Sequence, residues 1–171
     1  IALPMAAGLG ACGRDDPKTE PEKESATQPA AAPAAQEATV RIGHAAPLTG
    51  GIAHLGKDNE NGARLAIDQA NAKGMTIGGA KVKFELLAED DEEKPDRGPI
   101  IAQKFADAKV AGVVGHLNSG VTIPASAVLN QAGIPMVSGS ATNPKLTEQG
   151  FKNVFRVVGG DDQQGPAIAC Y

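Results

Sequence analysis

Two short segments of this chain combine serine and threonine hydroxyls with glycine-containing turns. Residues 113–120 read Val-Val-Gly-His-Leu-Asn-Ser-Gly, and residues 134–142 read Ile-Pro-Met-Val-Ser-Gly-Ser-Ala-Thr. Each joins an apolar run typical of a buried strand to a turn that offers hydroxyls and free backbone N–H groups. An open α/β sheet binds its ligands at the carboxyl ends of parallel strands. The two segments together therefore predict a site for a small polar or anionic group.

The apolar patterns around these segments predict alternating strands and helices. Strands are expected over residues 39–46, 81–87, 110–114, 134–137 and 154–158. Helices are expected from Asp58, as N-cap, to Lys73-Gly74, over 100–108 and 124–131, in a short turn at Leu146, and from Asp161 onward. The alternating run 81–87 suits an exposed or edge strand. Strands separated by helices imply right-handed βαβ units, so the expected fold class is α/β, a Rossmann-like and mostly parallel sheet with flanking helices.

The first 38 residues have a different composition from the rest. Residues 1–11 are uncharged and end in Leu9-Gly10-Ala11 before Cys12, which resembles the lipobox of bacterial lipoprotein signal peptides. That resemblance implies cleavage before Cys12 and lipid attachment to it; the alternative is a chance run of small residues ending in a free cysteine. Residues 13–38 are rich in Pro, Ala and Glu without large apolar side chains, which predicts a disordered tether. Three parts are expected: a signal-peptide remnant (1–12), the tether (13–38) and an α/β domain (39–171).

Five segments of the domain, taken in order, resemble one family. They are Ala46-Pro47-Leu48-Thr49-Gly50, Asn71-Ala72-Lys73-Gly74, Gly115-His116-Leu117-Asn118-Ser119, residues 134–142, and Asp162-Gln163-Gln164-Gly165-Pro166. This combination is similar to the leucine/isoleucine/valine-binding family of bacterial ABC-transporter solute receptors. The resemblance implies a type I periplasmic binding fold, in which two Rossmann-like lobes close on a ligand. It also implies a longer protein, of which this chain is roughly the first lobe, with apolar faces left uncovered.

The same resemblance implies roles for individual residues. Ser119 and Thr142 would bind an amino-acid carboxylate through their hydroxyls and backbone N–H groups. The carbonyl of Ser140 would accept from the ligand ammonium, and the second lobe would supply an acid. Neutral donors at a helix N-terminus can hold a carboxylate. The alternative is that these three residues are only helix caps and turn formers.

The full set of candidate ligand-binding residues is Leu55, Asn118, Ser119, Ser140, Ala141 and Thr142. Several family members place an aromatic side chain near the position of Leu55, over the ligand. This chain has Ile-Ala-His-Leu-Gly at residues 52–56, which leaves the side-chain specificity of the site open.

Other functional classes find little support. The chain has no GxSxG, no GxxxxGK[ST], and no GxGxxG after the first expected strand, so an enzyme is not expected. His44, His54 and His116 lack metal-ligand spacing, and the acidic run 89–93 is expected to be a solvated turn; no metal and no cofactor are predicted. Four Phe, one Tyr and no Trp, with a net charge of −4, argue against nucleic-acid binding.

The expected function is the substrate-binding component of an ABC importer. It would capture a branched-chain or other small amino acid, or a related amide, and deliver this ligand to a membrane permease. The protein would be a monomer when full length, located in the periplasm or cell envelope and lipid-anchored through Cys12. The alternatives are the ligand-sensing domain of an amide or amino-acid regulator and a Rossmann-like nucleotide-binding enzyme. The lipobox separates them, because a cytoplasmic sensor would have none.

Overall fold

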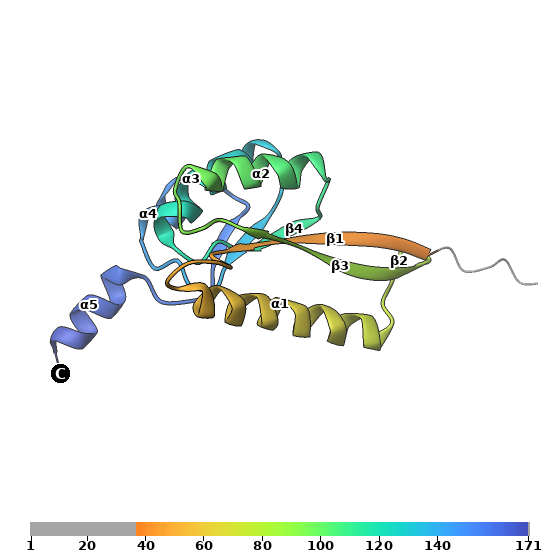
Figure 1. Ribbon diagram of the computed structural model, residues 1–171, viewed down its shortest axis with the longest axis horizontal. Helices are drawn as coiled ribbons and strands as arrows, with labels where there is room; N and C mark the ends of the chain where they lie inside the picture. Colours follow the sequence, from red (N-terminus) through yellow and green to blue (C-terminus); the bar gives the residue numbers. More distant parts are fainter. Residues whose placement is uncertain (1–36, 171) are drawn as a thin grey trace, which may run out of the picture. The chain divides into compact units, whose positions relative to one another are not determined.

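The computed structural model describes residues 37–170, which form one six-stranded sheet flanked by helices (Figure 1). The strands are β1 (Glu37–Ala46), β2 (Thr76–Ile77), β3 (Ala80–Asp90), β4 (Gly112–Gly115), β5 (Met136–Ser138) and β6 (Val154–Arg156). The helices are α1 (Ala53–Lys73), α2 (Arg97–Asp107), α3 (Ser119–Gln131), α4 (Lys145–Glu148) and α5 (Asp161–Ala169). Among these helices, none has the length and apolar composition needed to cross a membrane.

The sheet has the strand order β2-β3-β1-β4-β5-β6. All neighbouring strands are parallel except β2 and β3, which are antiparallel. The central strand β1 pairs with β3 from Glu37 to Ala46 and with β4 from Ile42 to Ala45. The predicted α/β class with a mostly parallel sheet is confirmed, and the carboxyl ends of β1, β3, β4 and β5 lie at the same edge.

Helices α2, α3 and α4 lie on one face of the sheet, and α1 lies on the other (Figure 1). The main core fills the first of these faces; its buried apolar residues are Ala45, Ile101, Ala102, Phe105, Val110, Val113, Ala125, Leu129, Ile134, Met136, Ala141, Leu146 and Val154. The ring of Phe105 is fully buried against β1. A Cβ at Gly43 would meet that ring at 3.1 Å, so the glycine leaves room for the aromatic side chain.

The other face of the sheet is covered less completely. An apolar groove of about 630 Å³ lies between α1 and the sheet. Its apolar lining comes from Ile42, Ala63, Ala66, Ile67, Ala70, Phe84, Leu86 and Val114.

Helix α1 begins at Ala53, so the prediction of an N-cap at Asp58 is wrong. The tertiary reason lies at Gly56, which is buried against the backbone carbonyl of Pro47. This close packing draws the first turn of the helix toward the loop after β1 and leaves no room for a side chain. The predicted end at Lys73 is confirmed, and Gly74 caps it in the left-handed conformation with φ 67°.

The predicted exposed or edge strand over 81–87 lies in β3. The two-residue strand β2 pairs with β3 at Ala80 and Lys81, and beyond these residues β3 is the outer strand, where the Asn71 side chain bonds the N–H and the carbonyl of Phe84. The prediction is therefore confirmed beyond Lys81.

The prediction of a solvated turn is wrong for the first three residues of the acidic run 89–93. Its first two residues end β3, and Asp91 is fully buried. A buried partner for this carboxylate, described below, explains how a charged residue can occupy that position.

Candidate functional site

The loops that follow β4 and β5 lie against one another. The backbone N–H of Asn143 donates to Ser119 Oγ over 3.2 Å, and Ser140 Oγ donates to the carbonyl of Leu117 over 3.0 Å. Both loops leave adjacent parallel strands at the same edge of the sheet. The structure therefore brings together the two Ser/Gly turns that the sequence singled out.

Ser119 is the first residue of α3, after the N-cap Asn118. The N–H groups of Ser119 and Gly120 belong to the open first turn, where a helix has no internal acceptors and carries partial positive charge. Because Ser119 Oγ accepts from Asn143, its own proton remains available to a second acceptor. This combination of a hydroxyl with helix N-terminal amides can hold an anion.

The backbone of Thr142 is held by its carbonyl. That carbonyl accepts from the N–H of Asp161 over 2.9 Å and from Arg156 Nη1 over 3.5 Å. Within residues 37–170, the N–H and hydroxyl of Thr142 make no hydrogen bond. A residue fixed through its carbonyl thus keeps two unengaged donors, on the loop that contacts Ser119.

The remaining candidates have different surroundings. Ala141 is fully buried, and its N–H donates to Ser138 Oγ over 3.0 Å. Asn118 Nδ2 lies 3.4 Å from Glu93 Oε1. Leu55, in the first turn of α1, is 45% exposed. The next turn of the helix lies beside the β5 loop, because a Cβ at Gly139 would stand 3.8 Å from an oxygen of Asn59.

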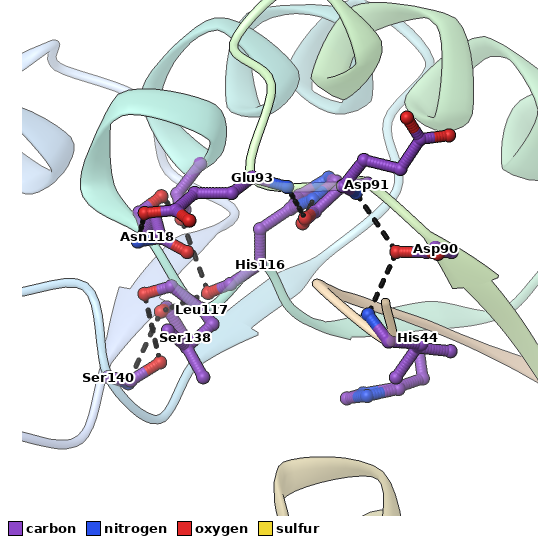
Figure 2. A network of polar contacts seen from close by, with 12 residues as sticks. His44, Asp90, Asp91, Glu93, His116, Leu117, Asn118, Ser138 and Ser140 are labelled. Atoms are coloured by element: carbon purple, nitrogen blue, oxygen red, sulfur yellow. Dashed lines mark hydrogen bonds and ion pairs between the residues drawn. The ribbon is translucent and has the colours of Figure 1, made fainter. Parts of the chain in front are cut away.

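Sequence reasoning missed the buried polar residues that support these loops. Figure 2 shows His116 directed at Asp91, with Ser138 close to the backbone that follows His116. The His116 carbonyl accepts from Ser138 Oγ over 3.0 Å. Thr122 Oγ1 lies 3.2 Å from the same carbonyl and 2.8 Å from the carbonyl of Asn118, so it shares its proton between them. Polar residues within otherwise apolar segments were the available signal, since the partners of His116 and Ser138 lie more than 20 residues away in sequence.

His44 lies on the α1 side of the sheet and is buried. Burial lowers the pKa of its imidazole, although the Val114 carbonyl, 3.0 Å from Nδ1, partly offsets that effect.

In residues 37–170, no three His, Cys, Asp or Glu side chains are grouped so that they could hold a metal ion.

A profile of the family described as "Periplasmic binding protein" matches residues 39–171, which include both loops. The chain belongs to the periplasmic binding protein family. Cys12 and residues 13–36 of the predicted tether fall outside the residues that the structure describes. The last two residues of the predicted tether, 37 and 38, belong instead to β1. The family assignment therefore applies to the α/β domain.

Particular members of the periplasmic binding protein family match this chain over a common region. The Leu/Ile/Val-binding protein BraC3 of Rhizobium johnstonii is 44% identical over 134 residues, which are 78% of this chain and 36% of BraC3. The chain thus spans about a third of the length of such relatives.

Solved structures of binding proteins also resemble this chain over about a third of their own length. An ABC transporter substrate-binding protein from Desulfitobacterium hafniense in complex with Leu has a TM-score of 0.67 and 36% identity, covering 78% of this chain and 38% of that one. A solute-binding protein from Rhodopseudomonas palustris BisB5, in complex with 3,4-dihydroxy benzoic acid, has a TM-score of 0.61 and 28% identity, covering 73% and 33%. Both have the type I periplasmic binding fold, which confirms the fold predicted from the sequence.

Proposed function

We propose that this chain is the first lobe of a two-lobed solute receptor of an ABC importer, and that Ser119 and Thr142 hold the carboxylate of its ligand. The observation that carries the proposal is the hydrogen bond from Asn143 N–H to Ser119 Oγ. It joins the two loops and leaves the Ser119 hydroxyl proton free to donate. No bond is made or broken in this function; the ligand is bound between two lobes and passed to a membrane permease.

The ligand class follows from the donors. The site offers hydroxyls and backbone N–H groups, and α3 adds the partial positive charge of its N-terminus. The two neighbouring binding proteins have Leu and 3,4-dihydroxy benzoic acid bound, which share a carboxylate and differ elsewhere. We assign carboxylate recognition to this lobe. A branched-chain amino acid is the preferred ligand because the relatives with the higher identities are Leu/Ile/Val-binding proteins.

The other candidate residues fit around this carboxylate. The Ser140 carbonyl can accept from an ammonium group. The Ser140 hydroxyl donates to the Leu117 carbonyl, which holds the residue in place. Ala141 and Asn118 support the two loops, and the exposed Leu55 can cover the ligand side chain. A second lobe would supply the acid that completes the ammonium site.

We further propose that the receptor acts in the periplasm or cell envelope, as the family name implies, and that lipid on Cys12 anchors it. Residues 13–36 of the predicted tether would hold the binding domain away from the membrane surface. A monomer is the expected state. Mass spectrometry of the membrane-extracted protein tests the anchor: a diacylglyceryl group on Cys12 is expected, and its loss in Cys12→Ala should release the protein from the membrane.

Calorimetry of the two-lobed protein tests the ligand site. Leucine should bind, and leucinamide, which lacks the carboxylate, should bind at least 10-fold more weakly. Ser119→Ala and Thr142→Ala should each weaken leucine binding by about 10- to 100-fold, because each removes a hydrogen bond to a charged group. Thr147→Ala, at an exposed position of α4, is the matched control and should leave the affinity unchanged. Unchanged affinity in both site variants would refute the assignment.

A further inference from the structure

The structure holds one ionisable pair that is completely buried. His116 Nδ1 lies 2.7 Å from Asp91 Oδ2, and both side chains are 0% exposed. The other carboxylate oxygen of Asp91 accepts from the N–H of Glu93 over 3.0 Å. Every other ion pair among residues 37–170 has at least one partner exposed to solvent. A buried pair of this kind restricts the backbone segments that carry it, since neither partner can be left alone in the interior.

The pair connects the ends of three strands. Asp91 follows β3, and His116 follows β4. The carbonyl of His116 accepts from the hydroxyl of Ser138, the last residue of β5 (Figure 2). The same carbonyl lies 3.2 Å from Thr122 Oγ1 of α3. His116 therefore hydrogen-bonds Asp91, the residue after β3, and Ser138 of β5, and it contacts Thr122 of α3.

The loops of the proposed ligand site begin directly at this connection. Leu117 and Ser119 follow His116 in the chain, and the Leu117 carbonyl accepts from Ser140. On the other loop, Ser138 Oγ accepts from the N–H of Ala141, the residue before Thr142. The position of both proposed carboxylate-binding residues thus depends on groups bonded to His116.

We propose that Asp91 and His116 are positioning residues that set the affinity of the carboxylate site by holding the Leu117–Ser119 loop against the β5 loop. They do not contact the ligand. The proton on Nδ1 is donated to Asp91, since the carboxylate can only accept. Nε2 of His116 has no hydrogen-bond partner in the described part of the chain, so the Asp91 contact is the one hydrogen bond that orients the ring there. This inference rests on the proposed function.

Replacing Asp91 by alanine removes the one hydrogen bond that the imidazole makes within residues 37–170. The ring must then turn toward water or another acceptor, and the backbone of His116 moves with it. Asp91→Asn is a milder change, because its Oδ1 can still accept from Glu93 and its Nδ2 can donate to Nδ1 of the other histidine tautomer. A suitable structural control is Asn71→Ala, far from the site, where the Asn71 amide bonds both the N–H and the carbonyl of Phe84.

The test measures leucine affinity in the two-lobed protein, at a temperature well below each variant's unfolding midpoint. Asp91→Ala should raise Kd at least 10-fold, and Asp91→Asn should raise it less. Asn71→Ala should lower the unfolding temperature while Kd stays within about twofold. A wild-type Kd in folded Asp91→Ala would overturn the proposal, as would an equal loss of affinity in Asn71→Ala.

A second readout does not depend on ligand. Amide hydrogen exchange in this 171-residue chain should be faster at Ala141 and Asn143 in Asp91→Ala and Asp91→Asn, while exchange at Phe84 stays at its wild-type rate. Unchanged exchange at Ala141 and Asn143 would overturn the positioning role. If the wild-type two-lobed protein binds no carboxylate, the proposed function fails on that result alone, and the exchange experiment still decides whether the pair holds the loops.

Discussion

The N–H of Asn143 reaches the hydroxyl of Ser119 across 24 positions of sequence, at 3.2 Å. This contact turns two separate turns into one cluster of donors at the carboxyl edge of the sheet. Ser119 does more than begin helix α3. Its hydroxyl oxygen accepts from a backbone N–H, and its hydroxyl proton is available to another acceptor. In the function proposed above, this cluster is the first lobe's half of the ligand site.

That half-site should bind weakly by itself. We expect the 171-residue chain to bind leucine at least 100-fold more weakly than the two-lobed protein, because the ammonium partner and the opposing surface are absent and the ligand remains in water. Calorimetry of both proteins under the same conditions measures this difference. Comparable affinity in the two would show that the site is complete on this lobe.

Asp90 should make the fold sensitive to acid. Burial by itself would raise the pKa of this carboxyl, but hydrogen bonds from Thr49 and from the N–H groups of Glu92 and Leu48 outweigh burial and lower the pKa below its ordinary 3.8. The stabilisation is therefore present above that value and lost as the pH falls through the lower pKa of the folded state.

Unfolding midpoints at pH 5 and pH 3 measure this effect. The difference between the two pH values should be smaller in Asp90→Asn than in the wild type. Asp68→Asn, at an exposed position of α1, provides the matched control and should keep the wild-type difference. An unaltered acid response in Asp90→Asn would contradict the prediction.

His44 should destabilise the fold at mildly acidic pH. Burial lowers its pKa below the ordinary 6.5, so the unfolded chain gains a proton between these two values while the folded chain does not. Stability consequently falls as the pH decreases from 6.5, by up to about 1.4 kcal/mol for each pH unit.

His44→Asn tests this effect, since its Nδ2 can still donate to the Val114 carbonyl in place of Nδ1. The free energy of unfolding between pH 7.5 and pH 5 should fall less in this variant than in the wild type. His54→Gln, at an exposed position in α1, should retain the wild-type slope. A wild-type slope in His44→Asn would mean that another group is responsible.

Two glycines of α1 should respond to alanine in opposite ways. Gly56 is buried against the Pro47 carbonyl, so Gly56→Ala forces the helix away from the loop and should destabilise the fold by about 1–3 kcal/mol. Gly62 has nothing within 4 Å of an added Cβ. Gly62→Ala should therefore stabilise the helix by about 0.5–1 kcal/mol through propensity. Urea unfolding of the wild type and the two variants measures the free energy of unfolding. Equal effects of the two substitutions would be incompatible with the packing at Gly56.

The spacing of apolar residues within single elements was sufficient to predict much of the fold. The apolar runs at 110–114 and 134–137 lie at β4 and β5, and the stripe that ends at Lys73-Gly74 lies on α1. These features depend on the side chains within one element, so their periodicity is visible in the sequence. The same holds for the two Ser/Gly turns, whose position after buried strands follows from the runs that precede them.

The wrong predictions concern residues whose structure depends on a partner distant in the sequence. Asp58 has the chemistry of an N-cap, yet the contact of Gly56 with Pro47 starts α1 earlier. Asp91 stands in an acidic run that resembles a solvated turn, yet His116 pairs with it in the interior.

The sequence by itself determined the α/β class, the succession of strands and helices, and the residue types at the ends of β4 and β5. The tertiary structure decided which of those residues meet: Asn143 with Ser119, and Asp91 with His116. The physical reason is that helix and strand patterns arise from neighbours a few residues apart. A hydrogen bond between loops instead requires two backbone segments, separated by more than 20 residues, to be placed together by the packing of the whole sheet.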